Sequence, residues 1–279
     1  MINLADYIRR GQRANTFRSM IRERLLCVAK EYPTDLISHA LREIPRIEFH
    51  IWLAIADKDP NSLHICDLGG GTGLFSVTCA ALGAEVLLVD DFNDPVNHQI
   101  GNSVLKVHET HGVKILQRDV IREGIEDVTQ KFDVITTFDS MEHWHHSPKR
   151  LFRTVKELLV PNGRFILSAP NCVNLRKRIT APLGRGQWSS MQDWYEFEVF
   201  RGHVREPDVR DLRYIADDMQ LENVRIYGYN WLGHLSDSLL IRTATRVIDV
   251  PLRYFPTLCS DIYMVGEKPA STKFKLAQK

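Results

Sequence analysis

The sequence predicts one α/β domain in which helices cover both faces of a doubly wound, mainly parallel sheet. Three observations support this fold class. Between residues 62 and 170, apolar strand-like runs alternate with helix-like segments, which is the pattern of consecutive βαβ units. The first strand-like run enters a helix-like segment through a glycine-rich turn. The second strand-like run ends in an acidic residue, Asp90.

The predicted elements follow in order along the chain. The strand-like runs are apolar throughout, as expected for strands covered on both faces. They lie at residues 62–68, 84–90, 113–119, 131–139 and 164–170, with two more at 221–229 and 260–268. Helices are predicted at residues 73–83, 94–112, 147–163, 206–220 and about 234–250. The helix at Ser147 has the clearest limits, because Pro148 suits a first turn and Pro161 and Gly163 mark its stop.

Three segments surround this core. Residues 1–60 are predicted to be a mainly helical extension, punctuated by Pro33 and Pro45, and residues 61–279 the main domain. Residues 170–205 form an insertion after the fifth strand that should cover a substrate. The extension has an apolar stripe of Phe17, Met20, Ile21, Leu25 and Val28. In the helix near 234–250, core packing accounts for the apolar residues Leu235, Leu239, Leu240 and Val247.

Bulk composition narrows the class of protein. The chain has 279 residues and a net charge of +1, so its overall charge argues neither for nor against nucleic acid. Its five cysteines are scattered without CxxC spacing, which indicates reduced thiols. The first residues lack the apolar core of a signal peptide, and no apolar run is long enough to span a membrane. A soluble, cytoplasmic protein is expected.

The turn after the first strand reads D-x-G-x-G-x-G, with Asp67, Gly69, Gly71 and Gly73. Glycines let the backbone turn sharply and approach a ligand closely. At the tip of the next strand, Asp90 is placed to accept hydrogen bonds from the ribose hydroxyls of an adenosine. The carboxylate of Asp67 would repel a pyrophosphate but suits the ammonium end of an amino-acid cofactor. These charges favour S-adenosyl-L-methionine over NAD.

At these residues the chain resembles the class I methyltransferases. DLGGGTG followed by VDD is similar to their first motif and the acidic loop after it. QRDV resembles the segment that binds adenine, which implies roles for the Asp119 side chain and the Val120 amide. FDVITTFDSMEHW resembles their fourth motif, with Asp139 at the end of a strand. The similarity spans roughly residues 62–229 and implies a Rossmann-like, seven-stranded sheet whose last two strands form an antiparallel pair.

Within that family, FDSMEH and RGHVREP look most like small-molecule and glycan O-methyltransferases, including those of ubiquinone biosynthesis. The start of the insertion, APNCVNLRKR, is similar to enzymes that modify bacterial surface sugars. An alcohol acceptor must lose a proton, and a positioned base assists. His143 is the preferred candidate base and His203 the second, while His145 and His146 are expected at the surface. The related E-x-x-E-H run of some relatives holds a divalent cation, so Asp139, Glu142 and His143 are alternative metal ligands.

The insertion carries features with two interpretations each. Its aromatic residues could stack on a sugar or quinone, or pack the insertion against the core; they are Trp188, Trp194, Tyr195, Phe197 and Phe200. The basic run from Arg176 to Arg178 could meet a phosphate or an anionic lipid, or be a solvated face. A small-molecule or glycan acceptor is favoured over RNA and over a non-catalytic binding module. A shallow membrane contact stays open, and the sequence gives no oligomeric state.

Overall fold

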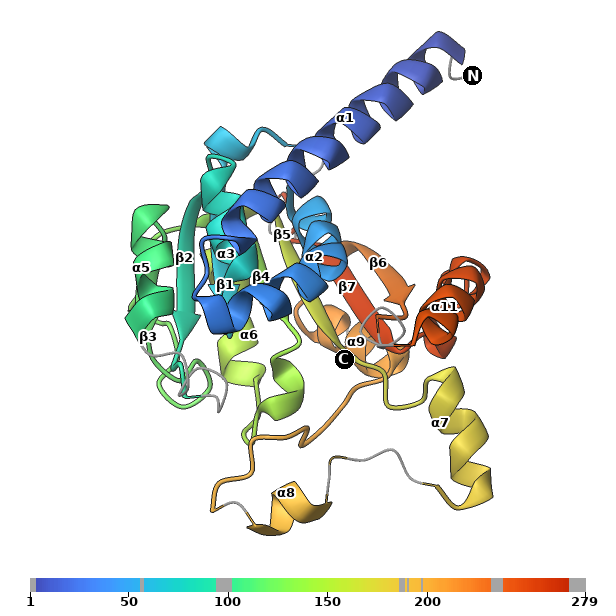
Figure 1. Ribbon diagram of the computed structural model, residues 1–279. Helices are drawn as coiled ribbons and strands as arrows, with labels where there is room; N and C mark the ends of the chain where they lie inside the picture. Colours follow the sequence, from blue (N-terminus) through green and yellow to red (C-terminus); the bar gives the residue numbers. More distant parts are fainter. Residues whose placement is uncertain are drawn as a thin grey trace, which may run out of the picture.

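A seven-stranded sheet forms the centre of the chain (Figure 1). The computed structural model describes residues 4–55, 58–93, 102–185, 189, 191–196, 198–231 and 238–270. The strand order is β3-β2-β1-β4-β5-β7-β6. The strands are β1 (His64–Leu68), β2 (Glu85–Asp90), β3 (Lys114–Gln117), β4 (Phe132–Phe138), β5 (Leu159–Pro170), β6 (Glu222–Tyr229) and β7 (Asp261–Glu267). The predicted fold class and all seven strands are confirmed.

Strand direction also follows the prediction. The pairs β1–β2, β1–β4, β2–β3 and β4–β5 are parallel. The last strand, β7, inserts between β5 and β6 and runs antiparallel to both. The carboxyl ends of β1, β2, β3 and β4 therefore share one edge of the sheet, where an open α/β fold binds its ligands.

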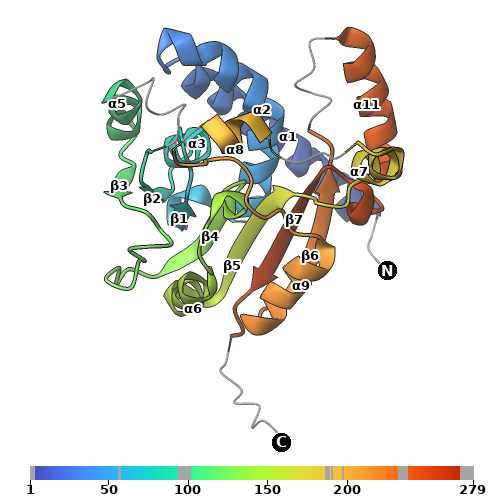
Figure 2. The same ribbon diagram turned by 90° about the horizontal axis from the view of Figure 1, so that it is seen from below.

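Helices cover the two faces of the sheet in two layers (Figures 1 and 2). Side chains alternate along each strand, so in β1 Ile65 joins one buried cluster and Cys66 the other. The first layer contains α1 (Leu4–Ala29), α2 (Thr34–Ile55), α3 (Leu74–Ala81) and α5 (Asn102–Thr110). The second contains α6 (Lys149–Leu158) and α9 (Val209–Asp218). The shorter helices are α7 (Leu175–Thr180), α8 (Met191–Glu196) and the 3₁₀ turns η1 (Pro60–Ser62), η2 (Met141–His143), η3 (Ala181–Leu183) and η4 (Pro256–Leu258).

The N-terminal segment is helical, as predicted, and shares the core of the sheet. Of its apolar stripe, Ile21, Leu25 and Val28 are fully buried, whereas Met20 is 42% exposed. Pro45 lies inside α2 instead of ending a helix. The residues before Asn102 in the predicted 94–112 helix lie outside the described part. In that described part, no helix is both long and apolar enough to cross a membrane.

The helix between β6 and β7 is α11 (Leu239–Leu252). Its apolar side chains do not pack into the core as predicted. Leu239, Leu240 and Val247 are 69%, 84% and 68% exposed, and Leu235 lies outside the described residues. The side of α11 that faces the domain is polar instead. Its Asp249 is buried and accepts hydrogen bonds from Asn230 and Arg253. The apolar pattern identified the helix correctly, but the prediction that this face joins the core is wrong.

Candidate functional site

The glycine-rich turn between β1 and α3 has the conformation that its sequence requires. Gly69, Gly71 and Gly73 have φ angles of 71°, 57° and 71°, which cost other L-residues about 1–2 kcal/mol each. A Cβ at Gly69 would lie 2.1 Å from the Ser140 Oγ, and one at Gly73 would lie 2.1 Å from the His108 Nε2. A Cβ at Gly71 would meet no atom within 4 Å. The middle of the turn therefore borders open space, while its two ends are packed.

Asp67 lies beneath this turn and is 1% exposed. Its carboxylate accepts hydrogen bonds from the hydroxyls of Ser76, at 2.7 Å, and Thr136, at 2.8 Å. Burial raises the pKa of Asp67 to about 6, although both hydroxyls oppose the shift. The carboxylate thus ties the turn to α3 and β4, and it presents almost no surface to a ligand.

Asp90 ends β2 and holds the middle of the same turn. One carboxylate oxygen accepts a hydrogen bond from the Gly71 amide at 2.8 Å, and the other accepts one from the Phe92 amide at 2.7 Å. The two aspartates therefore act at different levels, since Asp67 supports the turn from below and Asp90 borders its open side.

The segment after β3 presents both a carboxylate and an amide. Asp119 accepts hydrogen bonds from the amides of Ile121 and Arg122 through a single oxygen, Oδ1. The Val120 side chain is 5% exposed and packs into the core. Among the described residues, the Val120 amide donates no hydrogen bond. This pair offers an acceptor and a donor at the carboxyl edge of the sheet.

Asp139 follows β4 in a strained conformation, with a φ of 48°. Ser168 donates a hydrogen bond to its Oδ1 at 2.8 Å, and Arg46 of α2 donates one to its Oδ2 at 2.6 Å. Arg46 also forms an ion pair with Glu43. Burial opposes the charge of Arg46, but Asp139 and Glu43 outweigh it and raise the pKa of the guanidinium. Arg46 cannot be singled out from the sequence, because it stands among other charged residues of α2, such as Glu43 and Glu48.

A second contact from the N-terminal helices reaches the glycine turn. The Tyr32 hydroxyl, at the junction of α1 and α2, donates a hydrogen bond to the Thr72 carbonyl at 2.9 Å. Burial raises the pKa of the Tyr32 phenol well above its ordinary value, so this group stays a donor. Tyr32 cannot be singled out from the sequence either, because the contact joins segments 40 residues apart.

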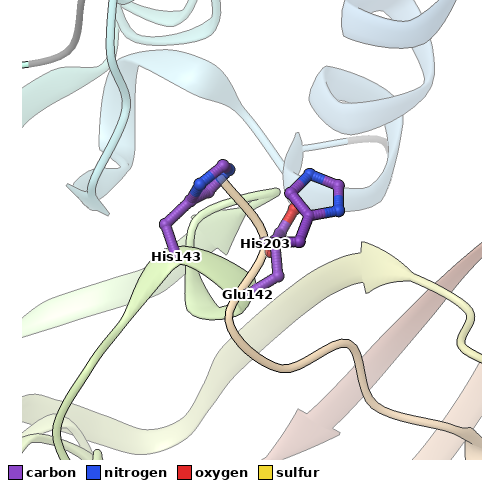
Figure 3. Close-up of side chains that lie close together, drawn as sticks. All are labelled: Glu142, His143 and His203. Atoms are coloured by element: carbon purple, nitrogen blue, oxygen red, sulfur yellow. The ribbon is translucent and has the colours of Figure 1, made fainter. Parts of the chain in front are cut away.

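His143 and His203, the two predicted bases, lie together although 60 residues separate them (Figure 3). Their ring centroids are 4.9 Å apart. The Nδ1 of His143 lies 2.7 Å from the Arg201 carbonyl oxygen, and the Nδ1 of His203 lies 2.8 Å from a carboxylate oxygen of Glu206. Since both partners are acceptors, each Nδ1 carries the proton, and Nε2 is the basic atom of each neutral ring.

Glu142 completes a group of three with these histidines (Figure 3). One ligand atom from each residue lies within 4.8 Å of the others. Glu142 is 1% exposed, and its Oε2 has no hydrogen-bond partner among the described residues. Burial, followed by the charge of Asp139, raises its pKa well above the ordinary value. Two imidazoles and one carboxylate form a donor set that suits a divalent transition metal. Asp139, the other metal ligand considered from the sequence, is held by Arg46 and Ser168.

The insertion is only partly packed. Trp194 and Tyr195 of α8 are 59% and 76% exposed, so they do not fasten the insertion to the core. Phe200 is half-buried, while Trp188 and Phe197 lie outside the described residues. The basic run is partly paired, since Lys177 forms an ion pair with Glu206 and Arg178 donates to the Val173 and Thr257 carbonyls. His145 and His146 are exposed, as the sequence predicts.

Comparison with known proteins identifies a family for this architecture. A family model described as a methyltransferase domain matches residues 39–226. The ubiquinone biosynthesis O-methyltransferase of Xanthomonas oryzae pv. oryzae (strain PXO99A) is 30% identical over 138 residues, which are 48% of this chain and 52% of that protein. The enzyme of the same name from Ruegeria pomeroyi is 33% identical over 111 residues, 39% of this chain and 42% of the relative. The chain spans about half the length of the curated relatives it matches.

Solved structures share the fold at lower sequence identity. The magnesium protoporphyrin IX methyltransferase of Synechocystis PCC 6803, solved with bound SAH, superposes with a TM-score of 0.51 and 16% identity. The match covers 82% of this chain and 84% of that one. A putative sarcosine dimethylglycine methyltransferase from Galdieria sulphuraria gives a TM-score of 0.51 at 13% identity, covering 86% of this chain and 92% of the other. At these identities the likeness shows the fold alone.

Proposed function

The chain belongs to the class I methyltransferases, which take S-adenosyl-L-methionine as cofactor, and from this premise we propose that it methylates a hydroxyl group of a small-molecule acceptor. The observation that carries the proposal is the pair formed by His143 and His203 at the carboxyl edge of the sheet. Such a pair supplies a base where the acceptor of an open α/β enzyme binds. Two of the relatives, which the chain matches over about half of their length, are named O-methyltransferases, and these names support an oxygen acceptor.

The residues around the glycine turn fit the proposed cofactor. Open space beside Gly71 leaves room for a ligand against the backbone. Asp90 borders that space with a carboxylate that can accept hydrogen bonds from ribose hydroxyls, and Asp119 with the Val120 amide offers an acceptor and a donor for an adenine edge. We propose that Asp67 acts indirectly, by holding the turn through Ser76. When bound, the cofactor supplies an electrophilic methyl group.

The protein's part in the chemistry is to align the acceptor and remove its proton. Methyl transfer from a sulfonium needs no oxyanion hole, because charge is dispersed as the methyl group moves, so alignment contributes most. Proton removal by a positioned base adds typically about 10²–10⁴-fold. His203 has the stronger support as that base, since the Glu206 carboxylate orients its ring. In this proposal, His143 lies beside it as a second acceptor of the proton.

A divalent cation at Glu142, His143 and His203 is a second candidate for activating the hydroxyl. The supporting observation is that one oxygen of the buried Glu142 carboxylate, Oε2, has no hydrogen-bond partner among the described residues. The Nδ1 contacts of both histidines resemble the outer contacts that fix the rings of metal-bound histidine. A cation bound there would lower the pKa of a coordinated hydroxyl, and the histidines would be ligands instead of bases.

The exposed Trp194 and Tyr195 support an acceptor with a flat ring, such as a phenol, a quinol or a sugar. An RNA acceptor is the less favoured alternative. Within 172–185 and 191–205, aromatic and basic residues do occur together, but a net charge of +1 offers little general attraction for a polyanion. Binding that weakens steeply with added salt would support the RNA alternative.

The first experiment is calorimetric titration with S-adenosylhomocysteine, with NAD⁺ as a parallel control. We expect micromolar binding of the former only, and its loss in Asp90→Ala. An acceptor screen of catechols, phenols and hydroxylated sugars follows, in apo and metal-supplemented protein.

One histidine variant and one glutamate variant, together with a chelator, separate the base from the metal. If His203 is a base, His203→Ala lowers kcat by about 10²-fold, chelators have no effect, and Glu142→Gln retains activity. If the site holds a metal, a chelator abolishes turnover, Mn²⁺ or Zn²⁺ restores it, and Glu142→Gln weakens metal binding. Absence of S-adenosylhomocysteine binding would contradict the proposed function itself, whether the site uses a base or a metal.

A further inference from the structure

The helix α11 turns its apolar side away from the protein. Leu240 and Val247, two turns apart, share one face of the helix and are 84% and 68% exposed. Tyr254 and Phe255, just after the last turn, are 83% and 60% exposed. The opposite side carries the buried Asp249 and contacts the domain. Burying these apolar side chains would be favourable, so the orientation implies an external partner.

The helix α7 continues this surface. Arg178 of α7 donates a hydrogen bond to the Thr257 carbonyl in the turn that follows α11, at 3.1 Å. The Asn171 side chain, just before α7, donates to the same carbonyl. Both views show α7 and α11 on the same side of the molecule (Figures 1 and 2). Ile179 and Leu183 are 57% and 71% exposed there. We call Ile179, Leu183, Leu240, Val247, Tyr254 and Phe255 the α7–α11 surface.

The charged residues within the two segments that carry the α7–α11 surface are almost all basic, although Lys177 of α7 is paired with Glu206. Residues 172–185 contain four basic residues and no acidic one. Residues 239–258 contain three arginines and a single acidic residue, Asp249, which is buried and paired with Arg253. The side chains of Arg185 and Arg246 are exposed and form no ion pair within the described part of the chain. Since the whole chain has a net charge of only +1, this surface concentrates positive charge locally.

From these observations we propose that the α7–α11 surface docks on an anionic lipid bilayer. Exposed aliphatic and aromatic side chains flanked by arginines are the composition of a helix that lies in a membrane interface. The basic residues complement anionic head groups. A second copy of the chain fits less well. Two copies meeting through this surface would bring their exposed arginines, Arg185 and Arg246, close together, and like charges across an interface are unfavourable.

Vesicle sedimentation tests the proposal with the full chain. We expect binding to vesicles of phosphatidylcholine mixed with phosphatidylglycerol, little binding to phosphatidylcholine alone, and release at high salt. Val247→Asp should lower the partition coefficient about tenfold, because the variant loses the insertion of one aliphatic side chain. The charge-reversal pair Arg185→Glu and Arg246→Glu should lower it about 25-fold or more, at about fivefold for each lost cation.

A matched control removes an exposed apolar residue elsewhere. Tyr214→Asp in α9 changes a side chain that is 70% exposed but lies outside the α7–α11 surface, and it should bind vesicles as the wild type does. Thermal unfolding of every variant shows that it remains folded. Equal binding to neutral vesicles, or unchanged binding by Val247→Asp, would overturn the proposal. A wild type that sediments as a dimer and a Val247→Asp variant that sediments as a monomer would assign the surface to a second copy instead.

Discussion

Alanine at Gly69 and alanine at Gly71 would impose nearly the same backbone strain in different surroundings. Both glycines have a positive φ, 71° and 57°, so each alanine costs about 1–2 kcal/mol of unfolding free energy through its backbone alone. At Gly71 nothing else is added, because no atom lies within 4 Å of the new Cβ. At Gly69 the new Cβ would lie 2.1 Å from the Ser140 Oγ and 2.8 Å from its Cβ.

The overlap at Gly69 determines the size of the difference. Relief of such overpacking costs typically about 1–3 kcal/mol, so Gly69→Ala should lose about 3 kcal/mol in total and Gly71→Ala about 1 kcal/mol. Ser140→Gly removes both clashing atoms. The double variant Gly69→Ala with Ser140→Gly should therefore recover most of the extra loss, less about 0.5–1 kcal/mol for the flexibility of the new glycine.

Affinity for S-adenosylhomocysteine should rank the variants differently. Gly71→Ala places a methyl group in the space proposed for the cofactor, so we expect at least a tenfold rise in Kd in a variant that remains well folded. Urea denaturation measures stability, and calorimetry measures affinity. Wild-type affinity in Gly71→Ala would refute the assignment of the cofactor to this space. Equal stability of the Gly69 and Gly71 variants would refute the steric argument.

Three further predictions concern groups that support the site. Burial holds the pKa of Asp67 at about 6, above its ordinary value, so its contribution to stability is complete below about pH 4 and is lost as the pH rises through 6, by up to about 3 kcal/mol. Asp67→Asn should thus gain stability relative to the wild type between pH 4 and pH 7, and parallel urea profiles would rule this out. Tyr32→Phe removes one hydrogen bond to Thr72 and should cost about 1 kcal/mol and a few-fold in cofactor affinity, whereas an unchanged calorimetric Kd would show that the contact does not position the turn. Arg46→Met leaves the carboxylates of Asp139 and Glu43 without their shared cation, and it should lower the free energy of unfolding by about 2–4 kcal/mol in urea denaturation. Asp139→Asn added to that variant should restore part of the loss. No recovery would contradict the role of the ion pair.

The features that could be predicted from the sequence depend on residues that are close together in the chain. Glycines with a positive φ, an acidic residue at a strand end and alternating apolar runs each depend on near neighbours in the chain. The positions of Gly69, Gly71 and Asp90 could therefore be predicted together with the seven strands. The same reasoning found His143 and His203 separately, because each lies in its own recognisable segment.

The features that were missed depend on distant segments or on what lies outside the chain. Arg46 and Asp139 are 93 residues apart, and no local pattern links them. For α11, periodicity reveals that one side of the helix is apolar, but it does not reveal whether protein or another phase covers that side. The exposure of Leu240 follows from the burial of Asp249 on the opposite side, where Asn230 supplies a hydrogen-bond partner after β6.

The coupling between the insertion and the loop after β4 links acceptor choice to the chemistry. The Glu142 carbonyl accepts hydrogen bonds from the Val204 and Arg205 amides, and His143 bonds to the Arg201 carbonyl. The end of the insertion therefore fixes both His143 and the adjacent His203, whichever of the proposed roles they have. A change in the insertion that alters the shape of the acceptor site also moves the groups proposed to activate the hydroxyl. Acceptor specificity and proton removal are therefore expected to change together in variants of residues 198–206, with KM and kcat affected in the same variants.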